Sequence, residues 1–168
     1  MASGKQLISQ VSKEDILKLM YYNPEKGLIW KVRRGRFAFP GEIVGGKGLE
    51  KSQVRFNGTR VYVHHVVWFL HKGYWPRERD DWIDHKDGNH HNNLIGNLRA
   101  ATPSQNNCNR RMEYDRGVKE TNGKFRAGIQ FENKKYFLGS FPTREEAAAA
   151  YQGASRVLHG EFSVFNRT

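Results

Sequence analysis

Residues 82–111 hold the amino acids of this 168-residue chain that are best suited to chemistry, because Asp, His and Asn are crowded there. Asp84 and His85 are adjacent, and Asn106 follows about twenty positions later. A carboxylate and an amide oxygen are hard ligands that suit Mg²⁺, an ion that shares phosphate oxygens of a substrate. A neutral histidine beside such an ion can accept a proton from water. The same residues could form a solvated turn or a helix cap, so the pattern alone leaves both interpretations open.

Short elements are predicted to position these residues. Trp82 to His85 has the pattern of a strand, and residues 93–99 suit a return segment after an Asp-Gly turn. Thr102 followed by Pro103 is typical of a helix start and predicts a helix from about 103 to 111. Because neighbouring strand residues point to opposite sides, Asp84 and His85 can serve one site only if the strand ends there.

Further elements are predicted upstream of this segment. Ser12 and Asp15 resemble a capping box and predict a short helix that ends before Asn23-Pro24. A short strand is expected at 28–32, and Asn57-Gly58 predicts a hairpin between two more strands. The apolar run 65–71 is predicted to be a buried helix or a buried strand, because periodicity cannot decide over so short a run.

The last third of the chain has a different pattern. Three short strands are predicted, with turns at Asn122-Gly123 and Asn133-Lys134. Thr143 to Glu146 reads as a full capping box that opens an amphipathic helix, and Gly160 is expected to end it. A three-stranded sheet with one helix makes a complete small module, so we place a domain boundary near 108–116.

Composition and charge limit the kinds of partner. The chain has 28 basic and 17 acidic residues and a net charge of +11, of which residues 1–114 carry +8. This excess predicts a polyanionic partner, nucleic acid above all. The single cysteine excludes an internal disulfide and a cysteine-built zinc site. No apolar run suits a membrane span and the start lacks a secretory pattern, so we expect a cytoplasmic protein with no membrane partner.

The run DHKDGNHHNN, followed by NLRAAT and QNN, resembles the HNH nucleases, the ββα-metal group, and specifically the phage and intron homing endonucleases. The upstream YYNPEKGLIWK, the Asn-Gly hairpin and VHHVVWFLHKGYWP also fit, over about residues 12–111. The resemblance implies an α+β nuclease domain at 1–111 that hydrolyses double-stranded DNA with Mg²⁺, or Mn²⁺ as a substitute. It implies 5′-phosphate and 3′-hydroxyl products and a phage or mobile-element origin.

By this resemblance the catalytic positions are His85, which activates water, and Asn97, which bridges the loop by backbone hydrogen bonds. Asp84 and Asn106 are the implied metal ligands. Many family members have His at the last position; Asn106 there indicates Mg²⁺ rather than tightly held Zn²⁺. Of the other histidines, His64 is expected to be structural, while the roles of His90 and His91 stay open.

Four arginines of this domain are candidate DNA contacts. Arg33, Arg34 and Arg36 lie in a Gly-flanked loop, where a charge run can also be a plain solvated face. Arg99 could contact a phosphate or anchor the neighbouring helix.

Residues 112–168 resemble an AP2 DNA-binding domain through Arg116-Gly117-Val118, Phe137 to Phe141, and Thr143 to Ala148. In that family a three-stranded antiparallel sheet lies in the major groove and one helix packs behind it. The resemblance implies DNA contacts from the following residues: Arg116, Lys119, Lys135 and Phe137. Phe137 stands where Trp is usual, and Thr121, Gly128 and Gln130 replace usual reading residues, so base preference is not carried over.

The leading prediction is a homing-type endonuclease that nicks or cuts duplex DNA, is addressed by its AP2-like part, and acts as a monomer or weak homodimer. The alternative is a non-catalytic, sequence-specific DNA-binding regulator with a decayed nuclease domain. An RNA-directed binder would share the same charge, and a competition between DNA and RNA would separate it.

Overall fold

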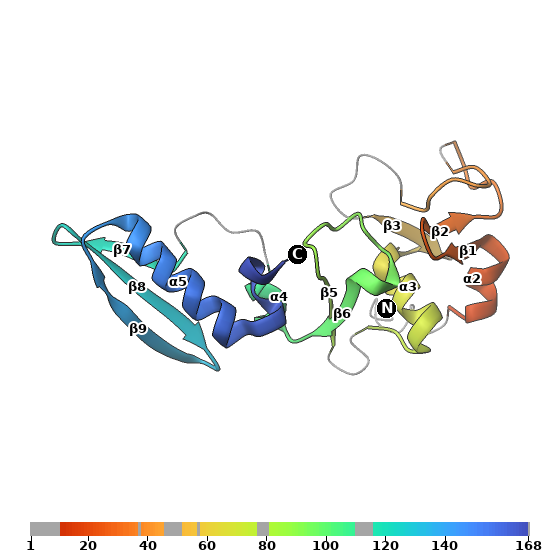
Figure 1. Cartoon of the computed structure of the whole chain (residues 1–168). Coiled ribbons are helices and arrows are strands. Elements are labelled where there is room, and N and C mark those ends of the chain that lie inside the picture. Colours follow the sequence, from red (N-terminus) through yellow and green to blue (C-terminus); the bar gives the residue numbers. More distant parts are fainter. Residues whose placement is uncertain are drawn as a thin grey trace. The chain divides into compact units, whose positions relative to one another are not determined.

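The structure is a computed structural model that describes residues 11–36, 38–45, 52–56, 58–76, 81–109 and 116–167. The chain divides into two compact units, residues 1–102 and 103–168. Each unit combines short helices with small antiparallel sheets, a mixed helix and strand architecture (Figure 1). The predicted domain boundary at 111/112 lies outside the described residues and stays a prediction.

No helix in the described ranges is long and apolar enough to cross a membrane.

The first unit begins with helix α2, Lys13–Leu19. The predicted capping box forms: Ser12 Oγ accepts a hydrogen bond from the Asp15 backbone N–H at 3.1 Å, and Asp15 Oδ2 accepts one from the Ser12 N–H at 3.3 Å. The helix passes directly into strand β1, Met20–Asn23, which pairs with β2, Gly27–Trp30. Strand β1 was not predicted, because four residues next to a helix carry too little alternation to show a strand.

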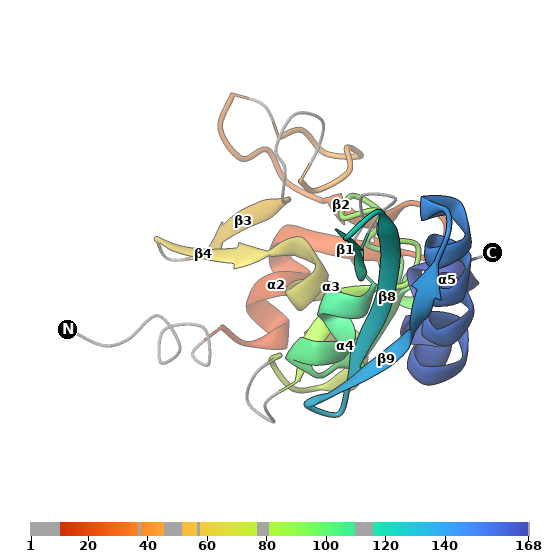
Figure 2. The same ribbon diagram turned by 90° about the vertical axis from the view of Figure 1, so that its left-hand side faces the viewer.

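A second hairpin leads into the longest helix of this unit (Figure 2). Strands β3, Gln53–Phe56, and β4, Thr59–Tyr62, pair as predicted, with Gly58 at φ +83°; Asn57 lies outside the described residues. Helix α3, Val63–Lys72, follows and decides the open question over 65–71 in favour of a helix. It ends where the Gly73 N–H bonds to the Phe69 carbonyl with glycine in the left-handed region.

Apolar side chains from these elements form one core. Its members include Ile16, Met20, Leu28, Val44, Val54, Val61, Val63, Val66 and Val67. Burying one aliphatic side chain of this size contributes roughly 1.5–3 kcal/mol. Ile83 and Leu98 belong to the same core, so it holds both strands that flank the polar segment.

These two strands are β5, Trp82–His85, and β6, Leu98–Ala101, which pair antiparallel with His85 opposite Leu98. Strand β5 ends at His85, as a shared site for its last two residues requires. The predicted return segment begins later than expected: a short 3-10 helix, η1, occupies Ile95–Asn97, and only residues from Leu98 form a strand. Hydrogen bonds from the Asp87 and Lys86 N–H groups to Asn97 close the loop between β5 and β6 before β6 begins.

The second unit opens with helix α4, Pro103–Cys108, which is shorter than the predicted 103–111; residues 110 and 111 lie outside the described ranges. Strands β7, Val118–Thr121, β8, Lys124–Phe131, and β9, Lys134–Phe141, form an antiparallel sheet in the order β7-β8-β9. Helix α5, Arg144–His159, lies against one face of this sheet (Figures 1 and 2). Two 3-10 turns, η2 at Gly160–Phe162 and η3 at Val164–Asn166, close the chain.

The turns of this sheet follow the sequence with one correction. Asn122 and Gly123 have φ of 51° and 71°, as a two-residue hairpin turn requires. The second turn is formed by Glu132 and Asn133, with φ of 47° and 62°, and the predicted pair Asn133-Lys134 is wrong by one residue.

The start and end of α5 follow the prediction with one difference. Thr143 Oγ1 accepts from the Glu146 N–H at 3.2 Å, which is one half of the predicted capping box, and the helix ends before Gly160 as expected.

Candidate active site

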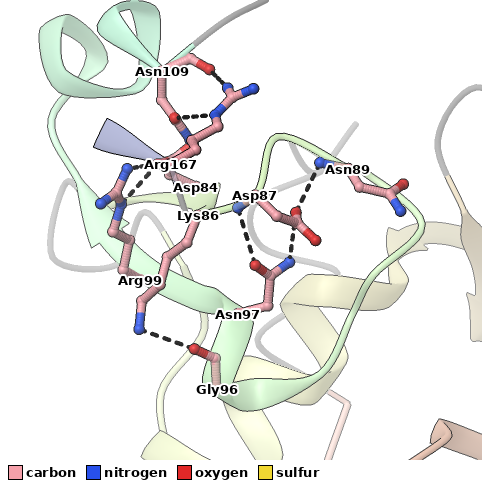
Figure 3. A network of polar contacts seen from close by, with 9 residues as sticks. All are labelled: Asp84, Lys86, Asp87, Asn89, Gly96, Asn97, Arg99, Asn109 and Arg167. Atoms are coloured by element: carbon pink, nitrogen blue, oxygen red, sulfur yellow. Dashed lines mark hydrogen bonds and ion pairs between the residues drawn. The ribbon is translucent and has the colours of Figure 1, made fainter. Parts of the chain in front are cut away.

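The end of β5 holds a buried ion pair. Asp84 is 5% exposed and lies directly opposite Arg99 on β6. Arg99 Nε donates to Asp84 Oδ2 at 2.8 Å, and Arg99 Nη2 forms an ion pair with the same oxygen at 2.7 Å (Figure 3). Arg99 itself is only 9% exposed, so its guanidinium is committed to the carboxylate beside it. The partner seen for Arg99 is a strand carboxylate, and both alternatives for Arg99, a phosphate contact and anchoring of the neighbouring helix, stay predictions.

His85 is oriented by a residue of the loop that follows β5, Asn93. His85 is 3% exposed, and its Nε2 lies 3.0 Å from Asn93 Oδ1. The Asn93 side-chain N–H₂ donates to the His91 carbonyl at 3.3 Å, which assigns Oδ1 as the acceptor facing His85. His85 Nε2 therefore carries the proton, and Nδ1 is the unprotonated nitrogen of the neutral ring.

The charge state of His85 follows from its surroundings. Burial lowers the pKa of His85, and the nearby His90 lowers it further, although the hydrogen bond to Asn93 acts in the opposite direction. A buried imidazole of this kind is neutral near pH 7 and can accept a proton. Asn93 was missed by sequence reasoning, because nothing separated it from the five other asparagines between 89 and 107.

Two more histidines pack against the His85 ring. His64 on α3 meets it edge-on at 5.0 Å between ring centroids, and His90 does so at 5.4 Å. Helix α3 and the loop thus restrain the imidazole from two sides. Across the described residues, no group of three or more His, Cys, Asp or Glu side chains is arranged to hold a metal ion.

Asn97 bridges the two ends of the loop between β5 and β6. Its Oδ1 accepts from the Asp87 N–H at 3.1 Å, and its Nδ2 donates to Asp87 Oδ1 at 2.9 Å (Figure 3). Nδ2 also donates to the Asn92 carbonyl at 2.8 Å. The Asn97 carbonyl also accepts from the Lys86 N–H at 2.9 Å. These contacts hold the residues that follow His85 against the start of β6.

Asp87 is the centre of this loop, which the sequence indicated only as an Asp-Gly turn. Its carboxylate accepts from the Asn89 N–H at 2.8 Å and from Asn92 Nδ2 at 2.7 Å, in addition to Asn97. Partial burial raises the pKa of Asp87, but these hydrogen bonds outweigh burial and lower the pKa below its usual value. The loop is thus organised around a charged carboxylate.

The remaining predicted residues lie elsewhere. Asn106 is on α4, in the second unit, and its role beside Asp84 stays a prediction. Arg116 is half-buried and donates from Nη1 to the Asn107 carbonyl at 3.2 Å. Lys119, Lys135 and Phe137 are exposed on the sheet.

The three arginines of the Gly-flanked loop are exposed. Arg33 stacks over the Phe39 ring at 5.0 Å, and Arg34 Nη2 donates to the Arg55 carbonyl at 3.3 Å. Arg36 lies next to Gly35, which has φ +71°. These positions allow both the DNA-contact and the solvated-face interpretations.

Known proteins share this segment. Residues 61–108 match the family of HNH endonucleases, and this span contains Asp84, His85, Asn97 and Asn106. Protein 3.8 of Escherichia phage T7 is 31% identical over 109 residues, which cover 61% of this chain and 88% of that protein. The chain belongs to the HNH endonuclease family.

A second viral protein is similar to this chain. The uncharacterized HNH endonuclease L560 of Acanthamoeba polyphaga mimivirus is 33% identical over 90 residues, or 52% of this chain. The chain spans only 48% of the length of that relative. No solved structure matches the chain. The family match ends at residue 108, so the AP2 resemblance of residues 112–168 stays a separate prediction.

Proposed function

We propose that the chain is a metal-dependent, homing-type DNA endonuclease that hydrolyses phosphodiester bonds of duplex DNA. One observation carries this proposal: a neutral, buried His85, oriented by Asn93, stands next to Asp84 within the segment that matches HNH endonucleases. The similarity to proteins of a phage and a giant virus supports an origin in a viral or mobile element.

In the proposed reaction His85 Nδ1 takes a proton from a water molecule. The water oxygen then bonds to phosphorus, and the bond from phosphorus to the 3′ oxygen breaks. The products carry a 5′-phosphate and, once the 3′ oxygen is protonated, a 3′-hydroxyl. A positioned general base typically contributes about 10²–10⁴-fold to the rate. Asn97 contributes indirectly, because it holds the loop that follows His85.

Asp84 and Asn106 would hold the divalent ion, with Mg²⁺ as the preferred ion and Mn²⁺ as a substitute. Their carboxylate and amide oxygens are donors that suit a hard cation, which can also bind phosphate oxygens of DNA. When bound, such an ion supplies positive charge against the oxygens of the scissile phosphate and stabilises the charge that develops in the transition state.

We propose further that residues 112–168 select the DNA site as an AP2-like domain. The three-stranded sheet backed by one helix supports this assignment, as do the exposed Lys119, Lys135 and Phe137. Cutting chemistry with little base preference and a separate addressing domain would together make a site-directed nuclease.

The test is incubation of supercoiled plasmid with the full chain and Mg²⁺, with and without EDTA. We expect conversion to open circles, lost with EDTA and lost in His85→Ala. His91→Ala is the matched control, because His91 is an exposed histidine of the same loop and should keep full activity. Cutting by His85→Ala at the wild-type rate would overturn the role of His85. DNA that is bound but never cut, even with Mn²⁺, would instead favour the non-catalytic regulator.

A further inference from the structure

The sheet of the second unit has two chemically different faces. Ala127 and Ile129 of β8 are 1% and 4% exposed and point toward α5, so the residues between them point outward. Cross-strand pairing extends this assignment to β7 and β9, because directly paired residues lie on the same side. We call this side the outward face; it consists of Lys119, Thr121, Lys124, Arg126, Gly128, Gln130, Lys135, Phe137 and Ser140.

The outward face is strongly basic. It carries four cations and, among these described residues, no Asp or Glu. Lys119 lies directly opposite Arg126, and like charges in directly opposed positions destabilise a sheet. The repulsion between these two cations destabilises the free protein. It is relieved when a polyanion binds, because the phosphates neutralise such charges.

Arg126 differs from the lysines of this face because an aromatic ring holds it. Its guanidinium carbon lies 4.9 Å from the centroid of the Phe137 ring, and Phe137 is 61% exposed. Stacking on a ring restrains a planar guanidinium without using its N–H donors. The donors of Arg126 thus remain available to a ligand while the side chain is already positioned.

The geometry points to Arg126 as a base-reading residue that recognises guanine in the major groove of duplex DNA, with Phe137 against the methyl group of a neighbouring thymine. A guanidinium forms two parallel hydrogen bonds to guanine O6 and N7, and an apolar side chain favours the thymine methyl group. This inference rests on the proposed function, since it requires that the outward face meets DNA. The inference adds to that function which base is recognised, guanine, and which two residues recognise the site, Arg126 and Phe137.

The chain offers a matched control on the opposite side of the same sheet. Arg144, the first residue of α5, stacks over the ring of Phe125 at 5.3 Å, and Phe125 belongs to the face covered by α5. Arg144→Gln therefore removes an arginine stacked on a phenylalanine, as Arg126→Gln does, but leaves the outward face unchanged.

The experiment selects bound sequences from a pool of random DNA duplexes with the full chain, in EDTA to prevent cutting. Wild type and three variants are compared: Arg126→Gln, Arg126→Lys and Arg144→Gln. We expect wild type and Arg144→Gln to enrich the same site, with a guanine next to a thymine. Arg126→Gln should lose the preference for that guanine by about 5- to 150-fold, and Arg126→Lys should lose part of it, because lysine can donate to guanine but lacks the planar fork. Arg126→Lys keeps the charge, so its overall affinity should fall less than that of Arg126→Gln.

Three results would overturn the inference. One is an enriched wild-type site without guanine, which needs no variant to interpret. Another is an unchanged guanine preference in Arg126→Lys and Arg126→Gln, with melting temperatures near wild type. The third is a wild-type chain that selects no duplex or that prefers single-stranded RNA in competition. That third result would also overturn the addressing half of the proposed function, whereas His85-dependent plasmid cutting would still support its nuclease half.

Discussion

At the residue scale, Asp84 and His85 are neighbours in the chain whose side chains have different partners. Asp84 is bound to Arg99 on the adjacent strand, whereas His85 is bound to Asn93 from the loop. The two side chains are therefore fixed independently, although one strand end supplies both. This separation allows each partner to be tested by itself.

Asn93→Ala should slow DNA cleavage by about 10-fold without weakening DNA binding. The change removes the acceptor of the His85 Nε2–H, and 10-fold corresponds to roughly 1.4 kcal/mol, close to the net value of one hydrogen bond. The measurement is kcat and KM for cleavage of one defined duplex. Asn89→Ala is the control, since Asn89 is exposed in the same loop and its side-chain Oδ1 accepts from the His91 N–H. Equal losses in both variants would mean that Asn93 only supports the loop.

Arg99→Ala should lower the free energy of unfolding by about 3–5 kcal/mol, because it leaves the buried Asp84 carboxylate without its cation. Urea denaturation followed by tryptophan fluorescence measures the loss. Arg60→Ala, at an exposed arginine of β4, should change stability by no more than about 0.5 kcal/mol. If Arg99→Ala is as stable as Arg60→Ala, the ion pair with Asp84 does not form in solution.

Much of this site was predictable, but its fine positioning was not. The adjacency of Asp84 and His85 and the spacing to Asn97 are local features of the sequence, and a resemblance carries such features well. The partners Asn93 and Arg99 act through cross-strand and cross-loop contacts. Such contacts depend on where β5 stops and how the loop folds back, which the residue types alone do not show.

At the element scale, packing and strand pairing explain two features that local sequence preferences do not: the helix over residues 65–71 and the position of the second hairpin turn. Helix α3 was ambiguous as a sequence because a run of only five apolar residues, 66–70, fits either structure, and burial against the core decides it as a helix. The second hairpin turn moved by one residue to Glu132, because strand length and pairing place that glutamate at a positive φ. In both cases tertiary contacts overrule local preference.

Gly117→Ala should destabilise the second unit far more than Gly123→Ala, although both glycines have similar φ, +77° and +71°. A Cβ at Gly117 would meet the Tyr151 ring of α5 and the Gly128 carbonyl, both closer than atoms can approach, whereas a Cβ at Gly123 meets nothing within 4 Å. We expect about 1–2 kcal/mol for Gly123→Ala from backbone strain, and about 1–3 kcal/mol more for Gly117→Ala from overpacking. Thermal unfolding measures both. Equal losses would show that α5 does not pack on this end of β7.

At the scale of the whole molecule, the net charge of +11 is spread over both parts of the chain, with +8 on residues 1–114. Charge of this amount attracts DNA whatever its sequence, so affinity by itself cannot show which surface binds. The salt dependence of binding can identify that surface. Each phosphate contact that is removed lowers the slope of log binding constant against log salt by a known amount. A useful pair of variants must change the same charge at nearly the same place.

Lys134 and Lys135 form that pair, because they are exposed neighbours at the start of β9 that point to opposite sides of the sheet. Lys135 pairs with Gln130 on the outward face, and Lys134 pairs with Phe131 on the α5 side. Lys135→Gln should lower the slope of log binding constant against log salt by about 0.9, the value of one phosphate contact. Lys134→Gln should leave the slope near wild type, although it removes the same charge. Equal slopes for the two variants would mean that charge attracts DNA to this unit without a defined contact face.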